Sequence, residues 1–282
     1  HETFEMKIVD SISKYRGLLE SIPRPTGLVP TMGYLHEGHR SIVREARLAN
    51  ASVIATIFVN PRQFSPAEDF EEYPRDPEAD IELLDSEGVD FVFMPSVEDM
   101  YPDGFDTTIN VGSVAARLEG KYRPSHFHGV ATVVCKLFCI CRPDRAYFGQ
   151  KDIQQCAVVD RLNTDLNLGV KVVVVPTVRD DDGLAISSRN VYLSSDERDA
   201  ALFISRSLFH VLEMWRSGEE RPSMLKTYTR TVLELSSLLS IDYVSIADPQ
   251  SIEEVERATP GSVVAIAARI GKTRLIDNIT LN

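Results

Sequence analysis

Three segments of this sequence carry histidine, lysine, serine and arginine side chains in patterns that could bind phosphate. The first comprises Met32, Gly33, Tyr34, Leu35, His36, Glu37, Gly38 and His39. It lies between a predicted strand and a predicted helix, where free backbone N–H groups and the helix dipole favour an anion. Gly33 and Gly38 allow the backbone to approach a ligand, and His36 and His39 lie on one side of the helix start. Two imidazoles there could donate hydrogen bonds to phosphate oxygens.

Other interpretations of this segment exist. It could be a plain helix start with two surface histidines. A zinc site is disfavoured, because Glu37 stands between the histidines and no third ligand follows nearby. The combination of a strand, a glycine turn and a His-x-Gly-His pattern favours phosphate binding.

The other two segments supply cations and hydroxyl groups. The second comprises Gly149, Gln150, Lys151 and Asp152, again between a strand and a helix. Lys151 adds a point charge where a helix dipole favours phosphate, although a solvated lysine beside an Asp152 N-cap fits the same pattern. The third comprises Ile186, Ser187, Ser188 and Arg189. Its hydroxyl groups and guanidinium could clamp an oxyanion, and the alternative is a polar linker.

Two glutamines could recognise the rest of a substrate. Gln63 follows a strand end and Gln155 lies one turn into a helix, so both could face a crevice at the carboxyl ends of the strands. Amide groups donate and accept hydrogen bonds, which suits hydroxyl and carboxylate recognition rather than proton transfer. Taken singly, each is more typical of a surface glutamine.

Three neighbouring cysteines, Cys135, Cys139 and Cys141, raise the question of a metal site. They stand in the apolar run 133–141, and free cysteine is among the most buried residue types. We therefore expect core packing, with no metal ligands among them.

Alternating strand and helix patterns must position these groups. Strands are predicted at 27–29, 53–59, 91–93, 146–148 and 170–175, and helices at 41–50, 76–86 and from about residue 152. This alternation predicts an α/β fold with a doubly wound, Rossmann-like parallel sheet in a first domain at residues 1–175.

After Pro176 the pattern changes. Apolar residues recur at three- and four-residue spacing from Ile204 to Trp215 and from Leu225 to Leu239, which predicts two amphipathic helices. Three strand-like runs follow, with Gly271-Lys272 suited to a tight hairpin. We expect a smaller C-terminal α+β domain at residues 176–282.

The composition restricts the class of protein. The chain has 282 residues, 43% hydrophobic and 26% charged, which is typical of a globular protein with a core. A net charge of −12 argues against general nucleic-acid binding. No apolar run predicts a membrane span, no signal-peptide pattern opens the sequence, and 4 cysteines are too few for a disulfide scaffold. We expect a cytoplasmic protein.

These motifs together resemble a known family. The His-x-Gly-His turn is similar to the signature of the HIGH-motif nucleotidyltransferase superfamily, which includes class I aminoacyl-tRNA synthetases. The Ser-Ser-Arg run resembles the mobile phosphate-binding loop of that superfamily. The fuller set resembles the pantothenate synthetase (pantoate–β-alanine ligase) family from about Met6 to the end of the chain. The matching segments are 30–39, 58–64, 73–75, 123–127, 147–152, 187–190 and 275–278.

The resemblance implies an ATP-dependent ligase that forms an amide bond in two steps. Pantoate and ATP give pantoyl adenylate and pyrophosphate, and β-alanine then displaces AMP to give pantothenate, a precursor of coenzyme A. The implied catalytic residues are His36, His39 (the proton donor), Lys151, Ser187, Ser188 and Arg189. The implied ATP-binding residues are Met32, Gly33, Tyr34, Leu35, His36, Glu37, Gly38, His39, Gly149, Gln150, Lys151, Asp152, Val178, Ile186, Ser187, Ser188 and Arg189. Gln63 and Gln155 would bind pantoate, and Gln63 would also lie near β-alanine.

The same resemblance implies ATP with Mg²⁺, no tightly bound organic cofactor and a homodimer. The net charge and the absence of an apolar run predict neither a nucleic-acid nor a membrane partner. Another small-molecule adenylyl- or nucleotidyltransferase of this fold would share the phosphate-binding residues but would not need Gln63 and Gln155 together. A tRNA synthetase is disfavoured by the charge of −12. A non-catalytic nucleotide-binding module could lose Lys151 or a histidine, whereas all are present here.

Overall fold

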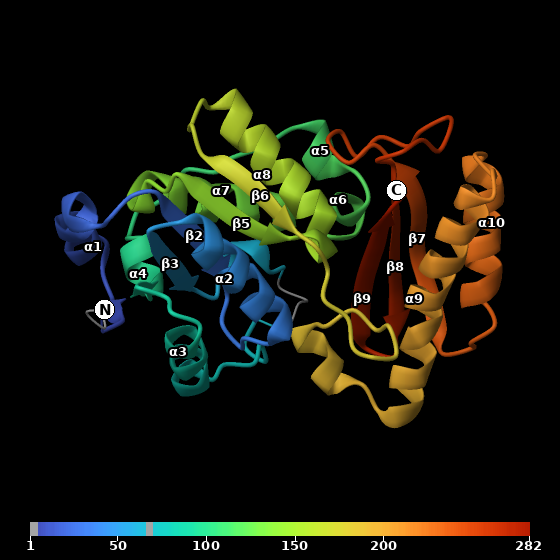
Figure 1. Cartoon of the computed structure of the whole chain (residues 1–282), viewed down its shortest axis with the longest axis horizontal. Helices are drawn as coiled ribbons and strands as arrows, with labels where there is room; N and C mark the ends of the chain where they lie inside the picture. The colour runs from blue at the N-terminus through green and yellow to red at the C-terminus, as the bar shows by residue number, and fades with distance from the viewer. Residues whose placement is uncertain (1–4, 66–69) are drawn as a thin grey trace. The chain divides into compact units, whose positions relative to one another are not determined.

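The structure is a computed structural model that describes residues 5–65 and 70–282, and the chain forms two compact units (Figure 1). The first unit comprises the chain up to Gly149 together with Val158–Val175. The second comprises Gln150–Ala157 together with Pro176–Asn282. The longer segment of the second unit thus begins where the sequence pattern changes, and the short segment 150–157 groups with it. The domain boundaries at 1–175 and 176–282 stay a prediction.

A six-stranded parallel sheet forms the centre of the first unit (Figure 1). In spatial order its strands are β1 (Lys7–Val9), β4 (Phe91–Phe93), β3 (Ser52–Ile57), β2 (Thr26–Thr31), β5 (Arg145–Gly149) and β6 (Lys171–Val175). Leu28 of β2 lies opposite Ile54 on one side and Ala146 on the other. The strand order therefore reverses at β2. Ligands of such sheets bind beyond the carboxyl ends of the strands at this reversal, where the loops after β2 and β5 begin.

Helices cover both faces of this sheet. They are α1 (Ile12–Leu18), α2 (Glu37–Ala49), α3 (Pro77–Ser86), α7 (His126–Cys141) and the later part of α8 (Ile153–Asp165). The first unit also contains three short helices, α4 (Val97–Met100), α5 (Ser113–Ala116) and α6 (Glu119–Tyr122). Val43 of α2 and Leu84 of α3 pack with Val92 of β4 in one buried cluster. The next residue, Phe93, points to the opposite face, where its ring centroid lies 5.2 Å from that of Tyr15 in α1. The doubly wound arrangement is confirmed.

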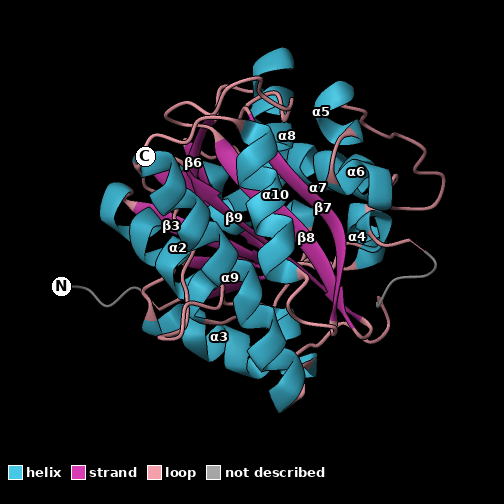
Figure 2. Cartoon of the chain, turned by 90° about the vertical axis from the view of Figure 1, so that its right-hand side faces the viewer, coloured by secondary structure: helices cyan, strands magenta, loops and turns pink. Residues whose placement is uncertain are grey.

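The second unit contains a small antiparallel sheet covered by two helices, which Figure 2 shows lying across it. Its elements are α9 (Ser195–Arg216), α10 (Pro222–Leu233), β7 (Leu239–Ala247), β8 (Val263–Ile270) and β9 (Thr273–Thr280). Leu208 and Leu225, from the two helices, share a buried core with Ile266 of β8. Gly271 has a φ of +55°, which the tight turn between β8 and β9 requires. The expected C-terminal α+β arrangement is confirmed.

The second amphipathic helix is shorter than its apolar spacing predicts. Helix α10 ends at Leu233, Leu235 is 71% exposed, and Leu239 begins β7 opposite Ile270. The apolar spacing predicts that the helix continues past residues 236–237, but these are two serines, which favour caps and turns over a helix interior. Pairing with β8 then decides the conformation of Leu239.

The expectation that the three neighbouring cysteines pack in the core is correct for one of them and wrong for another. Cys141 is buried, Cys135 is half-buried and Cys139 is exposed. Helix α7 is buried around most of its circumference, and Cys135, Lys136 and Cys139 lie on the narrow stripe that is not. The position on the helix therefore decides burial here. Burial raises the pKa of the Cys135 thiol to about 11 and that of Cys141 to about 12.

Candidate active site

A buried carboxylate holds the turn that joins β2 to α2. Asp80 of α3 is 3% exposed, and its two oxygens accept hydrogen bonds from the backbone N–H groups of Tyr34 (2.8 Å) and Leu35 (2.6 Å). Gly33 has a φ of +82°, and a Cβ there would lie 2.8 Å from an Asp80 oxygen, so this position requires glycine. Burial raises the pKa of the Asp80 carboxyl, and the hydrogen bonds from Leu35 and Tyr34 oppose that rise.

His36 and His39 form a reciprocal cap at the start of α2. The Nδ1 atom of His36 accepts a hydrogen bond from the Gly38 N–H (3.1 Å), and Nδ1 of His39 accepts one from the His36 N–H (3.2 Å). The two ring centroids are 4.1 Å apart. Because each Nδ1 accepts a hydrogen bond, each neutral ring carries its proton on Nε2. The pair can therefore donate through two Nε2–H groups to phosphate oxygens.

The two residues between His36 and His39 have different surroundings: Gly38 packs against a histidine ring, and Glu37 forms ion pairs at the surface. Gly38 lies against the His36 ring, where a Cβ would be 2.9 Å from His36 Cε1. The carboxylate of Glu37 lies on the exposed side of α2 and pairs with Arg44 (2.7 Å) and Arg40 (3.8 Å). The ion pairs orient the Glu37 side chain along the helix surface.

Gln63 is buried in a 3-10 turn after β3, and its amide has one orientation. Asn60 Nδ2 donates to the carbonyl oxygen of Gly129 (3.1 Å) and to Gln63 Oε1 (3.1 Å), while Asn60 Oδ1 accepts from the Tyr101 hydroxyl (2.7 Å). A backbone carbonyl only accepts, so the Asn60 amide cannot be reversed. Gln63 must therefore present Nε2 on its other side, where it lies 3.1 Å from Met32 Sδ.

Lys151 belongs to the second unit and is attached to β9. Gln150–Asp152 form a 3-10 turn, in which Asp152 is exposed and Lys151 half-buried. Asn278 of β9 is 2% exposed and donates through Nδ2 to the carbonyl oxygens of Gln150 (2.9 Å) and Lys151 (3.0 Å). Gly149, the predicted residue before this turn, is the last residue of β5 in the first unit.

The loop before α9 holds the remaining predicted phosphate-binding residues. The carbonyl oxygen of Val178 accepts from the Ile186 N–H (3.0 Å), so these two predicted residues are paired. Ser187 caps the 3-10 helix Ser188–Tyr192 by accepting from the Arg189 N–H (3.3 Å). The loop therefore presents its two serines and Arg189 at a capped helix start.

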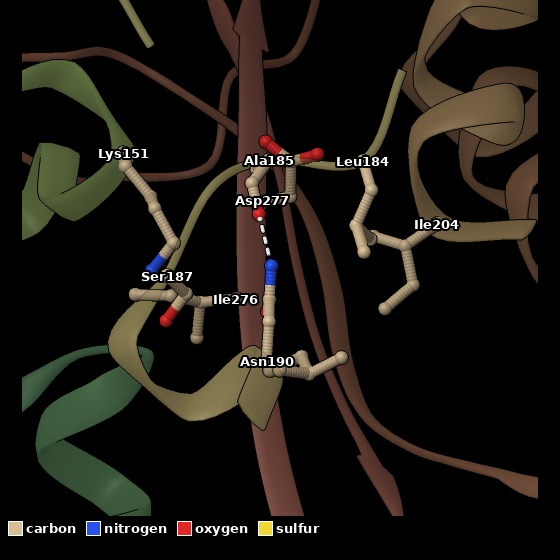
Figure 3. Close-up of a pocket in the computed structure, with 9 residues that line it drawn as sticks. Lys151, Leu184, Ala185, Ser187, Asn190, Ile204, Ile276 and Asp277 are labelled. Atoms are coloured by element: carbon tan, nitrogen blue, oxygen red, sulfur yellow. Dashed lines mark hydrogen bonds between the residues drawn. The ribbon is translucent and has the colours of Figure 1, made fainter. Parts of the chain in front are cut away.

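A pocket in the second unit is lined both by this loop and by the lysine turn (Figure 3). Lys151, Ser187, Asn190 and Asp277 line it, and Asn190 Nδ2 donates to the Ala185 carbonyl oxygen (3.1 Å). Two segments separated by more than thirty residues in the sequence thus meet at one pocket.

Asp277 fastens the start of the same loop. Its carboxylate accepts two hydrogen bonds from the Arg179 guanidinium (2.6 and 2.9 Å), and its side chain is 4% exposed. Arg179 also donates to the Gly183 carbonyl oxygen (3.2 Å). Bidentate, charge-assisted pairs of this kind are strong and directional.

Comparison with known proteins supplies the family. The family model described as pantoate-beta-alanine ligase matches residues 7–280. The chain belongs to the pantoate–β-alanine ligase family. The pantothenate synthetase of Roseiflexus sp. (strain RS-1) is 53% identical to this chain over 276 residues, which cover 98% of this chain and 99% of that relative.

Solved structures in the pantoate–β-alanine ligase family share the fold. The pantothenate synthetase of Thermus thermophilus matches with a TM-score of 0.94 at 44% identity, covering 98% of this chain and 99% of that one. A pantoate–β-alanine ligase from Francisella tularensis, complexed with beta-gamma ATP and β-alanine, matches with a TM-score of 0.79 at 34% identity, covering 98% of each. The predicted family, fold class and ligase class are confirmed.

Two further observations concern the ranges 5–65 and 70–282. Within them, no group of three or more His, Cys, Asp and Glu residues could hold a metal ion. No helix in those ranges is both long and apolar enough to cross a membrane.

The sequence analysis assigned no role to the residues that hold the predicted site residues in place. They are Asp80, Asn60, Arg179 and the pair Asp277-Asn278. Asp80 lies four residues before buried Leu84, so its place on the apolar side of α3 was a usable signal.

The predicted pantoate-binding residue Gln155 is half-buried on α8 in the second unit, beside buried Gln154.

Proposed function

We propose that the protein condenses pantoate with β-alanine to pantothenate, with ATP and a pantoyl-adenylate intermediate. A pantoate carboxylate oxygen attacks the α-phosphorus of ATP, and pyrophosphate leaves. The β-alanine nitrogen then attacks the acyl carbon, the nitrogen loses a proton, and AMP leaves. The observation that carries this proposal is the reciprocal cap of His36 and His39 at the start of α2, in a chain of this family. The Francisella tularensis relative, complexed with beta-gamma ATP and β-alanine, supports the choice of substrates.

The first step brings a carboxylate toward a triphosphate, so negative charge must be offset. We assign His36 and His39 to donate through Nε2–H to the phosphates, with His39 as the proton donor. Lys151, Ser187, Ser188 and Arg189 supply a point charge, hydroxyl groups and a guanidinium. In other enzymes, removing one donor of this kind weakens the stabilisation of the transition state by about 3 kcal/mol. The remaining ATP contacts are assigned to Met32–Gly38, Gly149, Gln150, Asp152, Val178 and Ile186.

The pantoate-binding residues in this proposal are Gln63 and Gln155, and Gln63 also serves β-alanine. The hydrogen bonds of Asn60 leave Gln63 with Nε2 as its outward group, so Gln63 acts as a donor. A donor suits the carboxylate or hydroxyl oxygens of pantoate. Gln63 Nε2 lies 3.1 Å from Sδ of Met32, a proposed ATP-binding residue.

The proposal also covers the form in which ATP binds and the oligomeric state of the protein. Mg²⁺ enters as part of MgATP. We further propose a cytoplasmic homodimer formed through the first unit, with no nucleic-acid partner. Strand β6 is an edge of the parallel sheet, and its Val174 is 43% exposed, which supports a partner along that edge.

The test is pyrophosphate release from MgATP with pantoate alone, followed by AMP formation when β-alanine is added. One equivalent of pyrophosphate per enzyme without β-alanine, and steady AMP production with it, is the expected result. Folded protein that releases no pantoate-dependent pyrophosphate would refute the proposal and would direct the assay to other carboxylates and nucleotides.

Two variants test the assigned roles. His39→Ala and Lys151→Ala should each lower the rate of pyrophosphate release by about 10²–10³-fold. The circular dichroism spectrum should remain unchanged. Near-normal turnover in either variant would refute its assignment.

A further inference from the structure

The dipeptide Asp277-Asn278 of β9 belongs to a segment that matches the family, yet the proposed reaction gives it no task. Both residues are buried, at 4% and 2% exposure. They bind two different loops: Asp277 holds Arg179 at the start of the loop 179–189, and Asn278 holds the turn that carries Lys151. All of these residues lie in the second unit.

The hydrogen bonds of Asn278 permit only one orientation of its amide. Its Nδ2 group donates to the carbonyl oxygens of Gln150 and Lys151, at 2.9 and 3.0 Å, so both hydrogens are used. Carbonyl oxygens only accept, and an amide oxygen cannot replace Nδ2 there. The Asn278 backbone is held as well, since its N–H donates to Asp277 Oδ1 (2.8 Å) and its carbonyl oxygen accepts from Arg179 (3.2 Å).

This arrangement explains why the lysine turn groups with the second unit although it directly follows β5 of the first. Gln150 adds a side-chain bond from Nε2 to Thr280 Oγ1 (2.9 Å) on the same strand. The turn and the loop 179–189 are therefore fixed to one strand. Lys151 and Ser187 line the same pocket as a consequence (Figure 3).

We propose that Asn278 is a positioning residue, which places Lys151 relative to the loop that carries Ser187, Ser188 and Arg189. The cations and hydroxyl groups that serve the phosphates then act as one preorganised body. The inference rests on the proposed function, because it assumes that Lys151 serves ATP.

The test is a double-mutant cycle in pyrophosphate release from MgATP and pantoate, with Asn278→Ala, Lys151→Ala and the combined variant. Two lost hydrogen bonds should lower kcat/KM for ATP by about 10-fold in the presence of Lys151. In the Lys151→Ala background the same change should cost less than about two-fold, because a residue that acts through Lys151 has nothing left to position.

The matched control is Asn163→Ala. Asn163, near the end of α8, also bonds backbone groups on both sides of its amide, donating to the Val170 carbonyl oxygen (2.8 Å) and accepting from the Val170 N–H (3.1 Å). It should leave kcat/KM for ATP within about two-fold of the wild type, and hydrogen exchange of residues 150–157 should rise only in Asn278→Ala. Asn278→Ser, too short to reach both carbonyls, takes its place if the alanine variant does not fold.

The outcomes separate the inference from the function beneath it. An equal loss with and without Lys151 would overturn the positioning role, because Asn278 would then act on the fold alone. Wild-type kinetics in Asn278→Ala beside an inactive Lys151→Ala would also overturn it, with the proposed function intact. Full activity in Lys151→Ala would refute the proposed role of Lys151 and the inference with it.

Discussion

Asp80→Asn is the substitution that most directly tests how the turn after β2 is held. The carboxylate accepts one hydrogen bond on each oxygen, from the N–H groups of Tyr34 and Leu35 at 2.8 and 2.6 Å. Asparagine has the same shape but offers only one acceptor, and its NH₂ group would face the other N–H donor. One backbone N–H at a site that is 3% exposed would therefore lose its partner.

The size of the effect follows from these contacts. A hydrogen bond to a charged group contributes about 1.5–3 kcal/mol, and an orphaned buried N–H has a similar cost. The loss is partly offset, since asparagine removes the cost of burying a charge, which raises the pKa of Asp80 in the wild type. We expect a net loss of about 2 kcal/mol in unfolding free energy, which corresponds to about 4–8 °C in Tm for a unit of this size.

The assay is thermal unfolding followed by circular dichroism, with pyrophosphate release as the functional readout. Release should fall about 10-fold, because the turn that leads into His36 and His39 loses order. The control is Asp76→Asn in the same helix. Asp76 is exposed and caps α3 by accepting from the Ala79 N–H (3.1 Å), a role that asparagine fills equally well. Equal Tm values and rates for Asp80→Asn and Asp76→Asn would refute the reasoning.

Three further predictions concern other parts of the molecule. Hydrogen bonds from Arg221 lower the pKa of Glu219 from its usual 4.5 to about 2. The pair therefore adds to the free energy of unfolding above pH 4.5, and this stabilisation is lost as the pH falls toward 2. The Tm difference between the wild type and Glu219→Gln should therefore be small at pH 7 and smaller in acid. A Tm difference that increases in acid would contradict this prediction. Maleimide should label exposed Cys139 in the native protein and Cys156 only after unfolding, because burial shields the Cys156 thiol and raises its pKa. Peptide mass spectrometry measures the order of labelling, and labelling of Cys156 before Cys139 would contradict the prediction. Asn60→Ala should raise the KM for pantoate about 10-fold while the KM for ATP stays the same, because Gln63 loses its orientation; equal changes in both constants would argue against that role.

Local sequence patterns predicted several elements of the first unit, but they gave no prediction for β1, α1 or α7. The run 53–59 predicts a strand and residues 76–86 predict a helix, and β3 (Ser52–Ile57) and α3 (Pro77–Ser86) lie close to these ranges. These predictions succeed because strand and helix periodicity depend on near neighbours. The same rule fails at Leu239, where pairing with β8 decides the conformation. It fails again at Cys139, where the exposed stripe of α7 outweighs the usual burial of cysteine.

The sequence by itself determined the alternating α/β pattern, the family motifs and the types of side chain at the candidate site. The reciprocal cap of His36 and His39 is local, because both residues lie within one helical turn. Only the tertiary structure decided which residues hold that chemistry in place: Asp80 lies 45 residues beyond Leu35, and Asn278 lies 127 residues beyond Lys151. Local periodicity could place Asp80 on the buried side of its helix, but it could not name the partners, because these hydrogen bonds join segments that are far apart in the chain.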